Sequence, residues 1–127
     1  MVSRPITASM LYDYECCPHR VTLDIFGDIS QRDKVNPFVQ LLWERGNAFE
    51  REVIQQLTIP VLNLRDIPTP EREQRTLNAI AAGESLIYGG RLTEGEFIGE
   101  PDLLRREEYG YIPGDVKSGA GIEDVTE

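Results

Sequence analysis

The stretch that decides the fold lies in the second half of the chain and reads Gly99-Glu100-Pro101-Asp102-Leu103-Leu104-Arg105-Arg106-Glu107-Glu108-Tyr109-Gly110-Tyr111-Ile112-Pro113-Gly114-Asp115-Val116-Lys117. Apolar residues on both sides of the charged run 105–108 predict two strands, over 96–104 and 109–117, joined by a hairpin turn at 105–108. Pro101 cannot donate a ladder hydrogen bond, which is typical of a strand edge or a kink. The pattern therefore indicates a β-hairpin that is interrupted just before Asp102.

This hairpin carries an acid on each strand and a lysine close to the second acid. The side chains of Asp115 and Lys117 alternate with Val116, so a strand places the carboxylate and the ammonium on one face. Asp102 reaches Asp115 across the hairpin only if the register is offset from the one that a turn at 105–108 implies. An isolated Asp-x-Lys is most often a surface ion pair, and that interpretation stays open beside a shared site.

A long helix is predicted from Pro37 to about residue 57, with Asn36 as its N-cap. At about 100° per residue, Glu50 lies in the middle of an apolar stripe formed with Trp43, Gly46, Val53, Ile54 and Leu57. A carboxylate there needs a partner, a proton or a metal ion. Glu50 is thus a candidate site residue, although a salt bridge with an arginine would explain its placement as well. Gly46, one turn earlier, indicates a close approach by a neighbouring element.

Further elements are expected on both sides of this helix. Apolar spacing predicts two short helices within 6–26, broken at Pro18, and the polar segment 28–36 reads as a loop. A short strand at 61–64, a helix at 71–82 ended by Gly83, and a strand at 85–88 lead toward the hairpin. We assign three aromatic side chains to the core, namely Trp43, Phe49 and Phe97.

Composition limits the class of protein. The 127 residues fit one domain over 1–127, and 28% charged residues without an apolar run of about 20 exclude a membrane protein. We see no secretory signal, and the only two cysteines, Cys16 and Cys17, are adjacent and cannot form a disulfide framework. We therefore expect a cytoplasmic protein. The net charge of −9 argues against a generic basic nucleic-acid binder, because phosphate contacts need positive charge.

Taken together, these features resemble the PD-(D/E)XK nucleases, and within that superfamily the RecB-like nucleases. The similarity extends over most of the chain. It is carried by ASMLYDY at 8–14 with CPHR at 17–20, LWERG at 42–46 with FERE at 49–52, LIY at 86–88 with Leu92, GEPDLL at 99–104, and YIPGDVKSG at 111–119.

The resemblance implies an α/β (α+β) fold with a restriction-endonuclease-like core, in which N-terminal helices pack on a small mixed sheet. It implies that Glu50, Asp102, Asp115 and the backbone carbonyl of Val116 bind Mg²⁺, and that Lys117 joins the three acids as a catalytic residue. Mg²⁺ prefers oxygen ligands and contacts phosphates, and Mn²⁺ can substitute for it. The implied activity is metal-dependent hydrolysis of DNA phosphodiester bonds. The resemblance allows for exonuclease action and for single-stranded DNA as the substrate.

Comparison with this group also raises an alternative. Many RecB-like nucleases have histidine at the position of Glu50, and they continue after the Asp-x-Lys motif with a further helix and strand. We therefore expect the C-terminal part of the fold to be missing, and to be supplied by another segment or a helicase-type partner. The alternative function is a non-catalytic scaffold or docking module within a larger DNA-processing protein. Cys17 matches one iron–sulfur ligand of some relatives, but the other three are absent, so we expect a free cysteine and no cluster.

Overall fold

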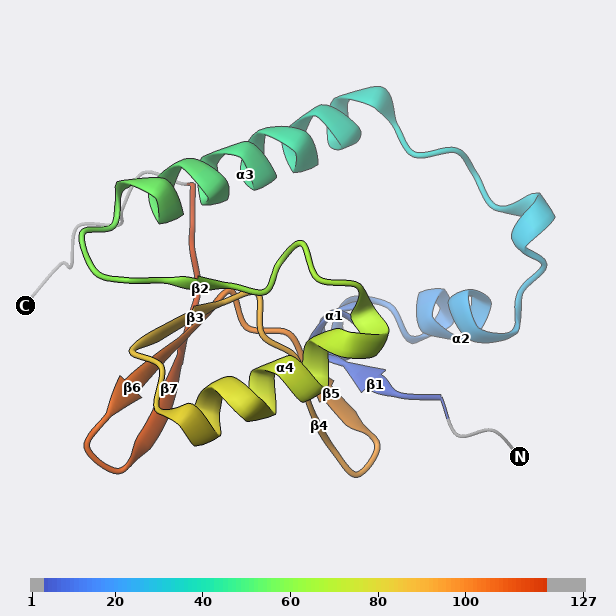
Figure 1. Ribbon diagram of the computed structural model, residues 1–127. Helices are drawn as coiled ribbons and strands as arrows, with labels where there is room; N and C mark the ends of the chain where they lie inside the picture. Colours follow the sequence, from blue (N-terminus) through green and yellow to red (C-terminus); the bar gives the residue numbers. More distant parts are fainter. Residues whose placement is uncertain (1–3, 119–127) are drawn as a thin grey trace, which may run out of the picture.

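A computed structural model describes residues 4–118 and has a mixed α+β fold (Figure 1). In this range the helices are α1 (Ala8–Cys16), α2 (Pro18–Phe26), the 3-10 helix η1 (Ile29–Gln31), α3 (Pro37–Gln56) and α4 (Thr69–Ala82). The strands are β1 (Ile6–Thr7), β2 (Leu62–Asn63), β3 (Leu86–Tyr88), β4 (Leu92–Glu94), β5 (Phe97–Gly99), β6 (Leu103–Glu107) and β7 (Gly110–Gly114). None of the helices formed by residues 4–118 has the length and apolar character that crossing a bilayer requires.

Local sequence signals explain where the helices begin and end. Pro18 lies in the first turn of α2 and separates it from α1, as predicted. Asn36 caps α3, because its side-chain oxygen accepts a hydrogen bond of 2.9 Å from a backbone N–H of the first turn. Gly83 ends α4 with a φ of 74°, a left-handed conformation that glycine adopts without steric cost. These predicted boundaries are confirmed, except that α4 already begins at Thr69.

The strands form two small mixed sheets. One has the order β1-β5-β4 and the other has the order β2-β3-β6-β7, with β1–β5 and β2–β3 parallel and the other pairs antiparallel. The prediction of one strand over 96–104 is wrong, because β5 and β6 belong to different sheets. Pro101 lies in the connection between them and cannot donate to either ladder. The interruption that was predicted just before Asp102 is therefore a change of sheet.

The hairpin turn lies farther along the chain than predicted. Residues 105–107 continue β6, and the partners in β7 run from Leu103 opposite Gly114 to Glu107 opposite Gly110. The charged run is compatible with an exposed strand, because Arg105 and Glu107 lie on one face and form an ion pair of 2.7 Å. The later turn shifts the pairing register of the two strands. In this register the position that follows the pair Leu103–Gly114, away from the turn, places Asp102 opposite Asp115. The second strand also ends earlier than predicted, so Asp115 and Lys117 follow β7 instead of lying on one strand face.

The core is small and lies between α4 and the four-stranded sheet. It is formed by Leu64, Ala79, Ile87 and Leu104, with partly buried neighbours that include Ile80 and Tyr111. Helices α1 and α2 contact one another, α1 contacts β1, and neither helix contains a buried residue. The helix that packs on the four-stranded sheet in this core is therefore α4, and the expected packing of the N-terminal helices is found only in part.

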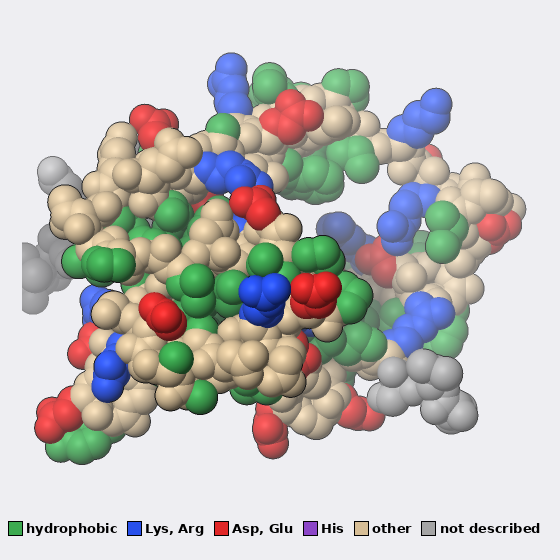
Figure 2. All heavy atoms as spheres, viewed as in Figure 1, with side chains coloured by type: hydrophobic (Ala, Val, Ile, Leu, Met, Phe, Trp, Pro, Cys, Tyr) green, Lys and Arg blue, Asp and Glu red, His purple; other side chains and the backbone are tan. Residues whose placement is uncertain are grey.

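The core assignment of the three aromatic residues is wrong. Trp43 is 58% exposed, and Phe49 and Phe97 are exposed as well. In α3 the partly buried positions include Glu50, Val53 and Ile54, which were predicted to face inward, and also Val39, which was not; none of the residues of α3 is fully buried. The helix crosses above the sheet in Figure 1, and its exposed apolar side chains line the margin of an opening in Figure 2.

Candidate functional site

The residues predicted from the sequence meet at one cavity of about 470 Å³. It lies between α3 and the open end of the β6–β7 hairpin. Glu50 reaches the cavity from α3. Asp102 directly precedes β6, and the segment after β7 supplies Asp115, Val116 and Lys117. The other lining residues are Leu42, Trp43, Gly46, Asn47 and Ser118.

Asp102 and Asp115 both line this cavity, and each shifts the pKa of the other. Burial raises the pKa of Asp102, and the hydrogen bond with Asp115 and the charge of Glu50 raise it further. The hydrogen bond from Asp102 lowers the pKa of Asp115, and Lys117 lowers it again. The two pKa shifts run in opposite directions, so Asp102 is the carboxyl of the pair that is harder to ionise. The Val116 N–H donates a bond of 2.9 Å to Asp102 Oδ2.

Lys117 lies at the edge of the site. Its Nζ is 2.5 Å from Asp115 Oδ2, and its side chain is 81% exposed. This ion pair raises the pKa of Lys117, so the ammonium stays charged at neutral pH. The interpretation of Asp-x-Lys as a surface ion pair is thus correct for the contact itself. The same pair also borders the cavity that contains Asp102 and Glu50.

Glu50 is held by one hydrogen bond and one ion pair. Its side chain is 12% exposed, the hydroxyl of Tyr88 donates a hydrogen bond of 2.7 Å to Oε1, and Arg65 Nε lies 3.8 Å from the same oxygen. The alternative that Glu50 pairs with an arginine is therefore confirmed. It does not exclude a place in the site, because Glu50 lines the cavity and its charge acts on Asp102.

The contact between Glu50 and Tyr88 predicts an unusual tyrosine titration. Burial, the hydrogen bond to Glu50 and its negative charge raise the pKa of Tyr88 from 10.0 to about 12. Between pH 10 and pH 12 the folded state therefore retains the hydroxyl proton of Tyr88, which the unfolded state loses. The stability that this contributes is present below pH 10 and is lost as the pH rises through 12. We expect the tyrosinate absorbance of the five tyrosines to contain one late phase that Tyr88→Phe removes and Glu50→Gln moves to lower pH. Titration of all five tyrosines together near pH 10 would contradict the contact.

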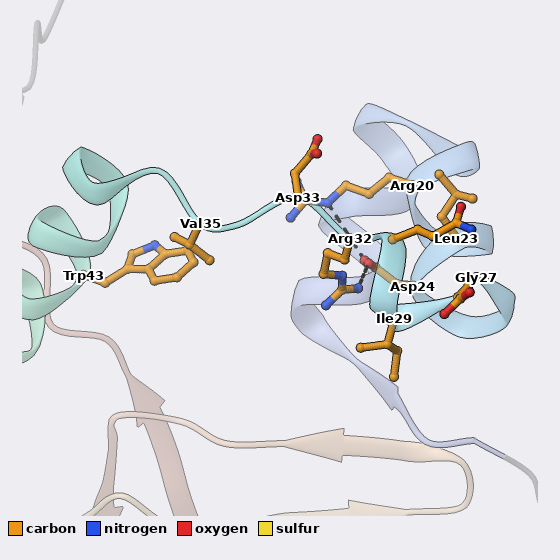
Figure 3. A pocket seen from close by; sticks show the side chains of 11 residues that line it. Arg20, Leu23, Asp24, Gly27, Ile29, Arg32, Asp33, Val35 and Trp43 are labelled. Carbon is orange, nitrogen blue, oxygen red and sulfur yellow. Dashed lines mark hydrogen bonds and ion pairs between the residues drawn. The ribbon is translucent and has the colours of Figure 1, made fainter.

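Gly46 and Trp43 differ from the predictions made for them. A Cβ built on Gly46 would meet no atom within 4 Å, so this glycine borders the cavity and does not accommodate a packed neighbour. Trp43 lines the site cavity and also a second cavity of about 720 Å³ between α2, η1 and the start of α3 (Figure 3). In the second cavity Arg32 pairs with Asp24, and Arg20 pairs with both Asp24 and Asp13, so each arginine has an acidic partner within the chain.

The chemistry of the cavity suits a hard cation, because its acidic and carbonyl groups offer oxygen ligands. Two of the three acids, Asp102 and Asp115, interact with each other and shift each other's pKa in opposite directions. Within residues 4–118, however, no group of three His, Cys, Asp or Glu residues lies so that it could hold a metal ion. Cys16 and Cys17 are free and exposed. The structure thus brings Asp102, Asp115 and Lys117 together, and Glu50, which lines the same cavity, pairs with Tyr88 and Arg65.

Comparison of the chain with protein-family models, with curated proteins and with solved structures found no match.

Sequence reasoning missed Tyr88 and Arg65, the two residues that hold Glu50. A signal was present for Tyr88, because a tyrosine at the end of the apolar run Leu86-Ile87-Tyr88 buries its ring and needs a partner for its hydroxyl. No comparable signal marked Arg65, which lies in a loop after β2 and reaches Glu50 only through the tertiary structure.

Proposed function

We propose that this chain is a metal-dependent nuclease of the RecB-like type with a restriction-endonuclease-like core. The observation that carries the proposal is the convergence of Glu50, Asp102, Asp115 and Lys117 on one cavity, although Glu50 and Lys117 lie in opposite halves of the chain. Three carboxylates that face one another repel unless a proton or a cation lies between them. A purely structural cavity has no need of such a set.

The residues of the cavity suit hydrolysis of a phosphodiester. Bound Mg²⁺ would supply charge neutralisation and lower the pKa of an attacking water, and Glu50, Asp102, Asp115 and the Val116 carbonyl would hold it. Water adds to phosphorus and one P–O ester bond breaks, leaving a phosphate monoester and a hydroxyl. The charged ammonium of Lys117 would stabilise the negative charge that develops on the phosphate oxygens. DNA, including single-stranded DNA, is the proposed substrate.

Metal binding is the direct test. We expect calorimetric titration of Mn²⁺ into the full chain to show stoichiometric binding that Asp102→Asn or Asp115→Asn abolishes, because each change removes a charged oxygen donor. Circular dichroism of each variant serves as the control for folding. A folded chain that binds no Mn²⁺ would reject the active-nuclease proposal.

A second candidate is the non-catalytic scaffold or docking module of a larger DNA-processing protein. The observation in its favour is that α3 has no fully buried residue and exposes Phe38, Leu42 and Trp43. The titration separates the two candidates, because a scaffold needs no cation.

A further inference from the structure

Polar contacts hold α3 above the four-stranded sheet. None of its 20 residues is fully buried, so the packing of apolar side chains alone does not fix its position. Three contacts join the second half of the helix to the sheet and to the loop after β2: Tyr88 to Glu50 at 2.7 Å, Arg65 to Glu50 at 3.8 Å and Arg51 to Asp66 at 3.0 Å. Two of these three contacts end on the carboxylate of Glu50.

The two contacts on Glu50 use the same oxygen. Tyr88 Oη donates to Oε1, and Arg65 Nε lies near Oε1. Among residues 4–118 no hydrogen bond or ion pair engages the other oxygen, Oε2. The carboxylate is thus fixed through one oxygen, while the other remains available to a ligand in the cavity that Glu50 lines.

Tyr88 is itself rigidly placed. It is 2% exposed, it lies in β3 between Asn63 of β2 and Leu103 of β6, and its carbonyl accepts a bond of 2.8 Å from Leu64 N. The next residue, Gly89, has a φ of 74°, and a Cβ there would lie 2.6 Å from Arg65 Cα. This close approach brings the backbone of Arg65 against the end of β3. The end of β3 therefore positions both Tyr88 and Arg65 next to Glu50.

We infer that Tyr88 is a positioning residue for Glu50: its hydroxyl holds Oε1, so that Oε2 is presented to a divalent cation shared with Asp102 and Asp115. The inference rests on the proposed function, because it gives Glu50 a role as a metal ligand. Hydrogen bonds to the ligands of a metal orient them, and removing one typically weakens binding by about 10- to 100-fold.

The test compares two tyrosine variants by calorimetric titration of Mn²⁺ into the full chain. We expect Tyr88→Phe to raise the Kd for Mn²⁺ by about 10- to 100-fold. Tyr111→Phe is the matched control, because Tyr111 also donates a bond of 2.7 Å, to the Glu84 carbonyl, but lies outside the cavity. Its Kd is expected to equal that of the parent chain, even if both variants lower the melting temperature.

A double variant separates positioning from a general structural effect. If Tyr88 acts through Glu50, then Tyr88→Phe weakens Mn²⁺ binding in the parent chain but causes no further loss in the Glu50→Gln background. Equal Kd values for Tyr88→Phe and the parent chain, with Asp102→Asn abolishing binding, would overturn this inference and leave the nuclease proposal intact. A folded parent chain that binds no Mn²⁺ would overturn both.

Discussion

Asp115→Asn is expected to reduce Mg²⁺-dependent DNA cleavage on the order of 10³-fold, a loss typical of removing one group that stabilises the transition state. Asp102 and Lys117 lower the pKa of Asp115, so they favour its charged form. Asparagine has nearly the same shape but lacks the charge. The measurement is the initial rate of cleavage of labelled single- and double-stranded DNA at a Mg²⁺ concentration that gives the parent chain its maximal rate.

Asp33→Asn is the matched control, because it makes the same chemical change at an exposed residue of the loop before α3. Its rate should equal that of the parent chain. Asp115→Asn cleaving at the rate of this control would contradict a role for the acid.

Lys117→Ala separates metal binding from DNA cleavage at the same site. The side chain is 81% exposed and lies near the acids only through its ammonium, so its removal should leave the fold unchanged. Loss of a positive charge beside Asp115 is expected to preserve or strengthen Mn²⁺ binding, whereas cleavage should fall because charge on the phosphate is no longer stabilised. Loss of Mn²⁺ binding in Lys117→Ala would instead indicate that the lysine organises the acidic residues.

Ile87→Ala is expected to destabilise the chain by about 2 to 5 kcal/mol, the usual range for such a truncation in a packed core. Ile87 is 0% exposed and lies between Leu62 and Leu104 on the neighbouring strands. The loss is a large fraction of the roughly 5 to 15 kcal/mol that keeps a typical domain folded. Urea denaturation followed by circular dichroism measures it.

Ile112→Ala provides the comparison for this prediction. Ile112 is 49% exposed on β7, so the same truncation should cost less than about 1 kcal/mol. Equal losses at the two positions would show that the buried cluster around Ile87 is not the core that stabilises the sheet.

Elements defined by nearby residues could be predicted from the sequence. Pro18 separates two helices, Asn36 and Pro37 begin α3, and Gly83 ends α4, because capping and backbone conformation depend on a few adjacent positions. The inward orientation of Glu50 also followed from helical periodicity. These signals act within one or two turns and need no information about distant parts of the chain.

The register of the hairpin could not be predicted in the same way. A charged run such as 105–108 is compatible with either a turn or an exposed strand, and pairing with β3 and β7 extends β6 through Glu107. That choice sets whether Asp102 faces Asp115. The sequence analysis therefore identified the two acids, while only strand pairing decided that they lie next to each other.

What the sequence by itself determined is thus the set of helices, the class of fold and the acids Glu50, Asp102 and Asp115 as candidate site residues. What only the tertiary structure decided is their arrangement: the donors Tyr88 and Arg65 on Glu50, the exposure of Trp43, and the pairing of Asp102 with Asp115. The physical reason is the separation along the chain over which each kind of interaction acts. Propensity and periodicity act between neighbours, whereas the contact from Tyr88 to Glu50 joins residues 38 positions apart and depends on how α3 lies over the sheet.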